Sequence, residues 1–253
     1  ESDLKSVFFI NEKNGWAVGA RGLIVATTDG GKSWEPQTSK VGNGLSDVCF
    51  LTPKTGFVAG EGETVLKTTN GGKKWTILSG GSQASGFGDD DTSVFSAIQF
   101  VDENTGWVAG VRITPSTQGQ ETLIQKTVDG GQTWVKQPTN SEDILEAIYF
   151  INATTGWAVG ENGAVFATTD GETWKALSSG SEEKLRSVRF IDAETGWAVG
   201  GDMGVNVILH TTDGGQNWAD QSNGKLFAYD IFSLDGNHIW LTGQNAIIMK
   251  YAK

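Results

Sequence analysis

The side chains best placed for chemistry lie in a short acidic turn that recurs along the chain. In Thr27–Trp34, TTDGGKSW, the pattern is Ser/Thr-x-Asp-x-Gly-x-Ser/Thr-Trp. A short carboxylate can accept hydrogen bonds from N–H groups of its own turn, and glycine supplies a positive φ. A catalytic carboxylate would occur once, whereas this turn has five near-copies, so we interpret it as a hairpin staple. The residues assigned to this structural role are Asp29, Trp34, Asn70, Trp75, Asp129, Trp134, Asp170, Trp174, Asp213 and Trp218.

Other catalytic arrangements are not evident in the sequence. Sialidase chemistry needs an arginine triad and a tyrosine nucleophile, and the nearest match, Arg112 in VRITP, stands alone in mid-chain. A glycosidase needs two facing carboxylates, but 30 acidic residues guarantee some pair by chance. The Gly-Gly pairs belong to the acidic turns and not to a strand-to-helix phosphate loop. We therefore predict a protein that is not an enzyme, with no catalytic and no cofactor-binding residue.

Composition excludes further classes of protein. The 253 residues carry a net charge of −11, which argues against a nucleic-acid partner. One Cys cannot form an internal disulfide, and two His with one Cys make a zinc site improbable. No apolar run approaches the roughly 18 residues that span a bilayer. We predict no metal site and no membrane-spanning segment.

The elements that must position these turns are revealed by internal repetition. The segment GWAVG, or a close variant, follows one apolar stretch and precedes a second apolar stretch and an acidic turn. Successive copies of this unit start 41, 50, 50, 40 and 41 residues apart. Each copy contains three or four short β-prone stretches separated by Gly, Asn and Asp. Six such units predict an all-β fold, a β-propeller of four-stranded antiparallel blades with almost no helix, in which residues 1–253 form a single domain.

All ten Trp fall on repeat positions. Five follow the acidic turn, and the other five occupy the second residue of the GWAVG-like segment, where Phe57 fills the remaining slot. Large aromatic side chains at such regular positions supply the core between blades. No Trp is left over to form a platform for binding sugars.

The combination of a strand, GWAVG, a short turn and TTDGGxxW resembles the photosystem II assembly and stability factor family of cyanobacteria and plastids. The acidic turn is the Asp box, or BNR repeat, which also occurs in sialidases, sortilins and xyloglucanases. The resemblance covers residues 4 to 250. It implies a seven-bladed, non-catalytic propeller on the extracytoplasmic side of a membrane that docks protein subunits. This chain departs from the family in showing six repeats and only four Arg, and a seventh blade could precede Glu1.

Two long insertions suggest where a partner docks. Thr76–Thr92 joins the second repeat to the third, and Val111–Thr122 interrupts the third. Both fall on the same propeller face, and loops carry function on such scaffolds. The protein-binding residues predicted there are Phe87, Asp89, Asp90, Asp91, Arg112 and Glu121. A solvated loop and a calcium site on the three aspartates are the alternatives.

Charged residues on the first strands of neighbouring repeats form a second candidate. The alignment of repeats predicts ion pairs between Glu146 and Arg186 and between Arg189 and Asp230. A small-ligand site in the propeller channel is the alternative.

We therefore expect a soluble or peripheral extracytoplasmic protein of the periplasm, lumen or cell surface. Its expected function is to dock protein partners, including a membrane-protein complex, as a scaffold or assembly subunit. The alternative is a carbohydrate-binding or glycoside-hydrolase-type Asp-box propeller. The sixth repeat supplies three strands, Leu226–Phe232, Ile239–Gly243 and Ala246–Lys250, so either its blade is three-stranded or residues are missing upstream of Glu1.

Overall fold

The computed structural model describes residues 3–81, 92–114, 119–202, 205–222, 228–235, 238–244 and 247–251. The chain divides into two compact units, residues 1–136 and 137–253, and each is described by itself. The organisation of all 253 residues as a single domain stays a prediction.

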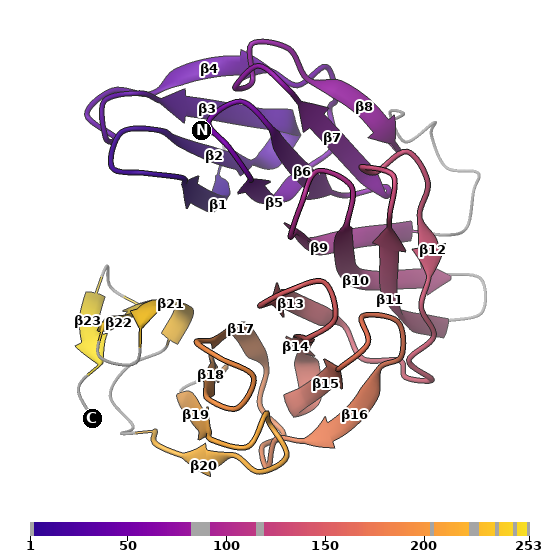
Figure 1. Ribbon diagram of the computed structural model, residues 1–253, viewed down its shortest axis with the longest axis vertical. Helices are drawn as coiled ribbons and strands as arrows, with labels where there is room; N and C mark the ends of the chain where they lie inside the picture. Colours follow the sequence, from indigo (N-terminus) through magenta and orange to yellow (C-terminus); the bar gives the residue numbers. More distant parts are fainter. Residues whose placement is uncertain are drawn as a thin grey trace. The chain divides into compact units, whose positions relative to one another are not determined.

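The first unit contains three four-stranded antiparallel sheets, in each of which the strands pair in chain order (Figure 1). Each sheet corresponds to one sequence repeat, and we call it a blade. The elements are β1 (Leu4–Phe9), β2 (Gly15–Gly19), the 3-10 turn η1 (Ala20–Gly22), β3 (Leu23–Thr27), β4 (Glu35–Thr38), β5 (Leu45–Phe50), β6 (Gly56–Gly60), β7 (Thr64–Thr68), β8 (Thr76–Ser79), β9 (Thr92–Phe100), β10 (Gly106–Thr114), β11 (Gly119–Thr127) and β12 (Val135–Lys136).

The second unit repeats this construction with two four-stranded blades and a sixth sheet that has three strands within the described residues. The elements are β13 (Leu145–Phe150), β14 (Gly156–Gly160), the 3-10 turn η2 (Glu161–Gly163), β15 (Ala164–Thr168), β16 (Lys175–Ser178), β17 (Leu185–Phe190), β18 (Gly196–Gly200), β19 (Val207–Thr211), β20 (Ala219–Asp220), β21 (Ala228–Asp235), β22 (His238–Gly243) and β23 (Ile247–Tyr251).

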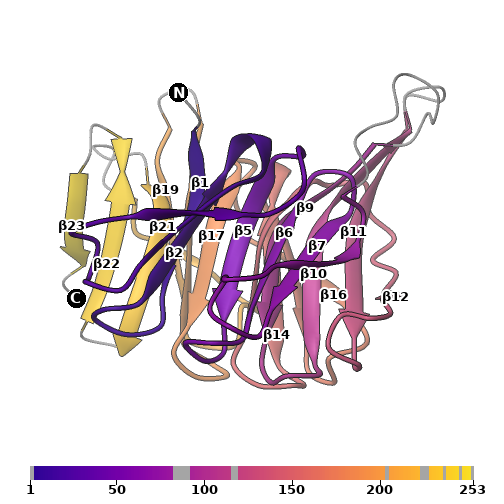
Figure 2. The same cartoon turned by 90° about the horizontal axis from the view of Figure 1, so that it is seen from above.

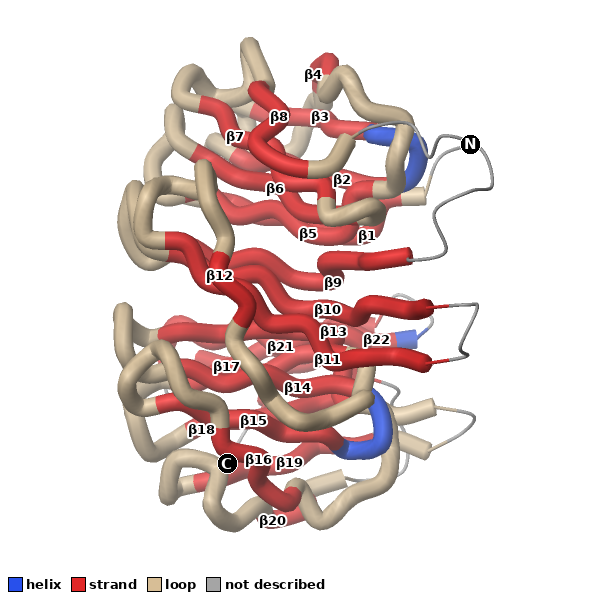
Figure 3. The backbone as a smooth tube through the Cα atoms, turned by 90° about the vertical axis from the view of Figure 1, so that its right-hand side faces the viewer, coloured by secondary structure: helices blue, strands red, loops and turns tan. Residues whose placement is uncertain are grey.

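The predicted fold class is confirmed, since six repeats give six antiparallel propeller blades with almost no helix. Figure 3 shows strands and loops, with helix limited to short turns such as η1 and η2. In the part of the chain that the structure describes, no helix is long and apolar enough to cross a membrane.

The core between blades is built on one repeated aromatic contact. The ring of Phe50, at the end of β5, stacks on Trp16 of the preceding blade, with centroids 3.5 Å apart, and meets Trp75 of its own blade edge-on at 6.0 Å. Stacked and T-shaped aromatic pairs stabilise beyond their buried area. The same ring also lies flat on Gly56, where a Cβ atom would come within 2.5 Å of it. The glycine that opens β6 is therefore required by close approach.

The same contact recurs in both units. Phe57 stacks on Phe100 in the first unit, and Trp157 stacks on Phe190 in the second, each with centroids 3.5 Å apart. A rigid, evenly spaced core of this kind holds the first strands of successive blades in a common register. Those strands and the loops between them carry the candidate sites.

Candidate docking surfaces

The Asp boxes form closed local networks. The carboxylate of Asp29 accepts hydrogen bonds from the Ser33 hydroxyl at 2.6 Å, the Ser33 N–H at 3.0 Å and the Thr27 hydroxyl at 2.7 Å. These donors, led by the Ser33 hydroxyl, hold the pKa of Asp29 well below its usual range. A carboxylate whose oxygens are occupied in this way is stabilised in its ionised form and is a poor general acid.

The other boxes keep this geometry. The hydroxyl of Thr133 lowers the pKa of Asp129 to about 2, and the side-chain amide of Asn217 lowers that of Asp213 to about 2. Backbone N–H groups of Thr173 and Glu172 hold the pKa of Asp170 below its ordinary value. In the second box Asn70 replaces the aspartate and still accepts the N–H of Lys74 at 2.9 Å.

The box tryptophans lie against the sheets. Trp75 and Trp174 are buried, while Trp34, Trp134 and Trp218 are half-buried. Each meets the phenylalanine that ends the first strand of its own blade at 5.7–6.0 Å in an edge-to-face contact. These positions give the tryptophans a packing role.

The insertion Val111–Thr122 extends the third blade into a projecting hairpin. Strands β9, β10 and β11 each have nine residues, whereas β5, β6 and β7 have six, five and five. Figure 2 shows the ends of β10 and β11 reaching beyond the neighbouring strands β6 and β7. The register places Arg112 opposite both Glu121 and Ser93. Directly paired residues of an antiparallel sheet point to the same face, so these polar side chains form one row.

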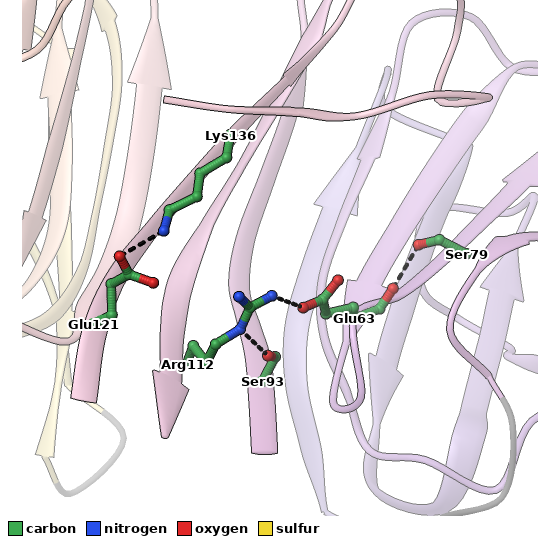
Figure 4. A network of polar contacts seen from close by, with 6 residues as sticks. All are labelled: Glu63, Ser79, Ser93, Arg112, Glu121 and Lys136. Atoms are coloured by element: carbon green, nitrogen blue, oxygen red, sulfur yellow. Dashed lines mark hydrogen bonds and ion pairs between the residues drawn. The ribbon is translucent and has the colours of Figure 1, made fainter. Parts of the chain in front are cut away.

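The charged side chains of this row form ion pairs with one another. The Arg112 guanidinium lies 2.9 Å from the Glu63 carboxylate, and its Nε donates to the Ser93 hydroxyl at 3.3 Å. The Lys136 ammonium lies 2.5 Å from the Glu121 carboxylate. Figure 4 shows the alternating order Glu63, Arg112, Glu121, Lys136 across the blade edge. The two glutamates cancel the charges of the arginine and the lysine, so this row offers no net charge to a ligand.

The structure therefore brings together two of the residues predicted for the insertion face, Arg112 and Glu121. The others, Phe87, Asp89, Asp90 and Asp91, lie outside the described residues. The protein-binding role of the whole set stays a prediction.

The two ion pairs predicted on the first strands of the second unit are wrong. Glu146 pairs with Lys184 at 2.5 Å and not with Arg186. Asp230 accepts the Ser187 hydroxyl at 2.6 Å and the N–H of Ile231 at 2.8 Å, and it forms no ion pair with Arg189.

The alignment of the sixth repeat explains the misassignment, because Phe232, and not Asp230, pairs with Trp240 as Arg189 pairs with Trp197. The register of β21 against β22 shifts between Ala228 and Asp230, which turns Asp230 toward its own next N–H group and toward the preceding blade. Asp47 in the first unit does the same, accepting the Ser6 hydroxyl and the Val48 N–H at 2.8 Å each. Asp230 thus occupies the repeat position of Asp47 and is part of the contact between blades.

A cation–aromatic cluster occupies the surface where the ion pairs were expected. The Arg189 guanidinium lies 4.7 Å from the centre of the Tyr149 ring and 5.6 Å from that of Phe232. Arg186, three residues earlier on β17, lies 5.8 Å from the Tyr229 ring, and its Nε donates to the Gly201 carbonyl at 3.3 Å. We call these five side chains the arginine cluster.

The charges of the arginine cluster have no carboxylate partner in the described part of the chain. Among the residues that the structure describes, neither Arg186 nor Arg189 forms an ion pair, and Arg189 Nε is buried without a hydrogen-bond acceptor. Tyr229 and Phe232 are each 49% exposed, so the cluster is open to solvent. Arginine held over aromatic rings keeps a full charge and a planar array of donors that matches a carboxylate.

Sequence reasoning singled out Arg186 and Arg189 but missed the aromatic residues that hold them. The available signal was the recurrence of Tyr149, Tyr229 and Phe232 on the first strands of the adjacent repeats. In the described ranges, no group of three or more His, Cys, Asp or Glu is arranged to hold a metal ion.

The blades, the boxes and the stacked Phe–Trp core define an Asp-box, or BNR-type, β-propeller. The family model described as photosynthesis system II assembly factor YCF48 matches residues 1–86, 37–141, 135–226 and 172–252, so the chain belongs to that family. No curated protein matches the chain.

Solved structures of the family share the fold. The chain is similar to a structure titled YCF48 bound to D1 peptide, with 19% identity, a TM-score of 0.52 and coverage of 100% of this chain and 94% of the other. YCF48 from Cyanidioschyzon merolae also has 19% identity and a TM-score of 0.52, with coverage of 100% and 96%.

Glycoside hydrolases also share the fold. The GH74 enzyme of Niastella koreensis is 16% identical, with a TM-score of 0.71 and coverage of 97% of this chain and 44% of the other. The chain thus spans less than half of that enzyme. Likeness at this level of identity concerns the arrangement of blades alone.

Proposed function

We propose that this propeller is a non-catalytic docking subunit that binds a segment of another protein through carboxylate groups received by the arginine cluster. Membership of the YCF48 family supports a role in assembly. The family structure with a bound D1 peptide supports a peptide segment of a protein as the kind of partner.

The observation that carries this proposal is the unpaired charge of Arg189. A buried donor without an acceptor is unfavourable, by about 1–3 kcal/mol when it stays unsatisfied. A ligand carboxylate that reaches the terminal nitrogens of this guanidinium gains a charge-assisted hydrogen bond and meets a charge that no described carboxylate neutralises. The flanking rings of Tyr149 and Phe232 orient the guanidinium and limit its loss of rotamer freedom on binding.

We further propose that the protein acts outside the cytoplasm, at or near a membrane-protein complex. The family resemblance and the Gly-, Thr- and Asn-rich turns support this location. The net charge of −11 repels acidic partners from most of the surface. Recognition of a carboxylate would then be confined to a local positive site such as the arginine cluster.

The experiment captures proteins from native membranes with the immobilised full chain and then measures binding of overlapping peptides from the captured protein by calorimetry. Arg189→Gln should weaken the best peptide at least about tenfold, which corresponds to about 1.4 kcal/mol. Arg21→Gln makes the same charge change at an exposed site in the first unit and should leave affinity within about twofold, as expected for a distant exposed charge.

Two results would overturn the proposal. Equal losses in both variants would point to a general charge effect, and full binding by Arg189→Gln would exclude the arginine cluster. Thermal unfolding of each variant shows whether the fold is intact.

Glycan binding or hydrolysis is the second candidate, supported by the similarity of fold to GH74 enzymes. Hydrolysis would need two carboxylates that face one another across a bound sugar. Incubation with xyloglucan, followed by detection of reducing ends, and a glycan array test this alternative. Saturable glycan binding without peptide binding would favour it over docking.

A further inference from the structure

The second blade carries three lysines and no acidic residue at the end where its box lies. Its strands alternate in direction, so the turn between β5 and β6 and the box between β7 and β8 lie at the same end of the sheet. Lys54 is in the turn, and Lys73 and Lys74 are in the box. All three residues are exposed, and we call them the lysine cluster.

The other repeats that contain a box have acidic residues in the corresponding turn or box. The first blade has Glu12 and Asp29, and the third has Asp102, Glu103 and Asp129. In the second box Asn70 replaces the aspartate, yet its side-chain oxygen still accepts the Lys74 N–H at 2.9 Å and the Thr68 hydroxyl at 3.0 Å. The second box thus keeps the geometry of the others without their negative charge.

The charges of the lysine cluster are not neutralised within the part of the chain that the structure describes. None of the three ammonium groups forms an ion pair there. The protein as a whole has a net charge of −11, so this patch has the opposite sign to most of the surface. Neighbouring like charges repel one another, and an anionic ligand that neutralises them relieves this repulsion.

The segments that carry the lysines are fixed in place. The Gly71 N–H donates to the Lys54 carbonyl at 2.9 Å, which joins the turn to the box. The Gly71 carbonyl accepts the Trp16 indole N–H at 3.2 Å and the Gln37 side-chain amide at 3.0 Å, both from the first blade. A backbone that is already ordered lowers the entropy that binding would otherwise cost.

We propose that the lysine cluster is a second docking surface, which binds an acidic segment of a second protein and so goes beyond the proposed function. Lysine ammonium groups are compact charges on flexible stems, so they can meet several carboxylates without a fixed geometry. Their field speeds the encounter with an acidic partner and selects against basic ones.

The third blade limits the size of the ligand. Its turn and box place Asp102, Glu103 and Asp129 at the corresponding end of the next sheet. The Lys67 ammonium donates to the Gly130 carbonyl at 3.2 Å, so the third box lies directly beside the second blade. A broad anionic membrane that reached the lysines would also meet these carboxylates and be repelled. A narrow acidic segment can contact the second blade alone.

The first test measures the binding of a fluorescein-labelled, glutamate-rich peptide by anisotropy. The full chain carries Arg189→Gln throughout, which weakens the contribution of the arginine cluster. Adding Lys54→Gln and Lys73→Gln should lower affinity at least about fivefold, as expected for the loss of two exposed charge contacts. Lys13→Gln with Lys32→Gln is the matched control at the same positions of the first blade, and it should change affinity by less than about twofold.

A single substitution tests the charge without removing a lysine. Asn70→Asp restores the carboxylate found in the other boxes and adds a negative charge beside the lysine cluster. It should weaken the glutamate-rich peptide by about two- to fivefold. Thermal unfolding shows that the fold is intact, and unchanged peptide affinity in a folded Asn70→Asp chain would contradict the proposal.

Protection from acetylation locates the contact. Saturating peptide should protect Lys54, Lys73 and Lys74, read by mass spectrometry, while Lys13 and Lys32 stay reactive. Equal protection of all five lysines, or equal losses of affinity in the two paired variants, would overturn the proposal. Binding to phosphatidylglycerol vesicles that Lys54→Gln with Lys73→Gln abolishes would also overturn it, because the ligand would then be a membrane. The partner captured from native membranes is not used here, so failure leaves the result for the arginine cluster unaffected.

Discussion

The projecting hairpin of the first unit and the arginine cluster of the second unit use charge in opposite ways. In the hairpin, Arg112 and Lys136 each lie within 3 Å of a glutamate. In the cluster, Arg186 and Arg189 lie over aromatic rings and have no carboxylate partner among the described residues. A long insertion therefore does not by itself mark the place where charged side chains lack a partner. Here those side chains lie on the fifth blade, whose repeat has no long insertion.

The physical reason lies in how each arginine is held. Exposed ion pairs contribute little net stability, since solvent screens them and side-chain entropy opposes them. Such pairs can nevertheless set the direction of a projecting hairpin. An aromatic bed holds a guanidinium through its stem and its face and does not neutralise its charge.

The largest effect is expected from the box tryptophans of the two units. Trp174→Ala and Trp134→Ala should destabilise the fold by about 3–5 kcal/mol, as for other large core truncations. Trp174, which is 7% exposed, should give the greater loss. Urea denaturation measures the change. A variant of unchanged stability that has lost binding would show that the box tryptophans bind ligand.

Acid should destabilise the boxes of both units. The pKa of Asp129 is lowered from 3.8 to about 2 by donors from Thr133, so its contribution to stability is complete above about pH 4 and is lost as pH falls to about 2. Asp129→Asn should reduce the slope of stability against pH in this range, and Asn70→Asp should increase it. Thermal melting at several pH values checks both signs, and equal slopes would contradict this account.

A smaller effect is expected when the aromatic bed of Arg189 is altered. Tyr149→Leu should weaken peptide binding by about two- to fivefold, in line with about 0.5–1 kcal/mol for a cation–π contact. Tyr149→Phe retains the ring and should bind as the wild type does. Calorimetry on both variants tests this expectation, because an equal loss of peptide affinity in the two would assign the role to the Tyr149 hydroxyl.

The ion pairs of the hairpin should have still less influence. A double-mutant cycle of Arg112→Ala and Glu63→Ala should give a coupling of about 0.2–1 kcal/mol in stability. Peptide affinity should change less than it does in Arg189→Gln. A coupling well above this range would mean that the hairpin is a structural element of the blade.

The smallest change in stability is expected from deletion of Ser82–Asp91, because no repeat position lies in this segment. Partner binding should nevertheless fall, and the effect should shrink as salt rises, since three aspartates attract a basic patch. Binding at several salt concentrations measures this. Full binding after the deletion would leave the arginine cluster as the sole candidate surface.

Repeat reasoning predicted the strands and boxes well, because their signals are local. The box aspartates take their hydrogen bonds from residues two to four positions away, as for Asp29 with Thr27 and Ser33. It failed for Asp230 because the sixth repeat was aligned two residues out, and Phe232, not Asp230, holds the position of Arg189. It also missed the contact of Tyr149 and Phe232 with Arg189, although the three residues occupy the same position on successive first strands, because only the packing of blades shows that side chains at this position touch.

The sequence by itself determined the all-β class, the six blades and the hairpin staples, since alternating apolar stretches and turn residues act over short distances. Only the tertiary structure decided which side chains satisfy one another across blades. Trp75 donates to Gln37 and Trp174 to Gln137, whereas Leu78 packs in the cluster with Trp134 and Leu177 in the cluster with Trp218. Likewise Gly56 is required because the ring of Phe50 lies on it. Contacts between segments far apart in the chain, and the burial that they create, fixed these choices and left Arg189 without an ion pair among the residues that the structure describes.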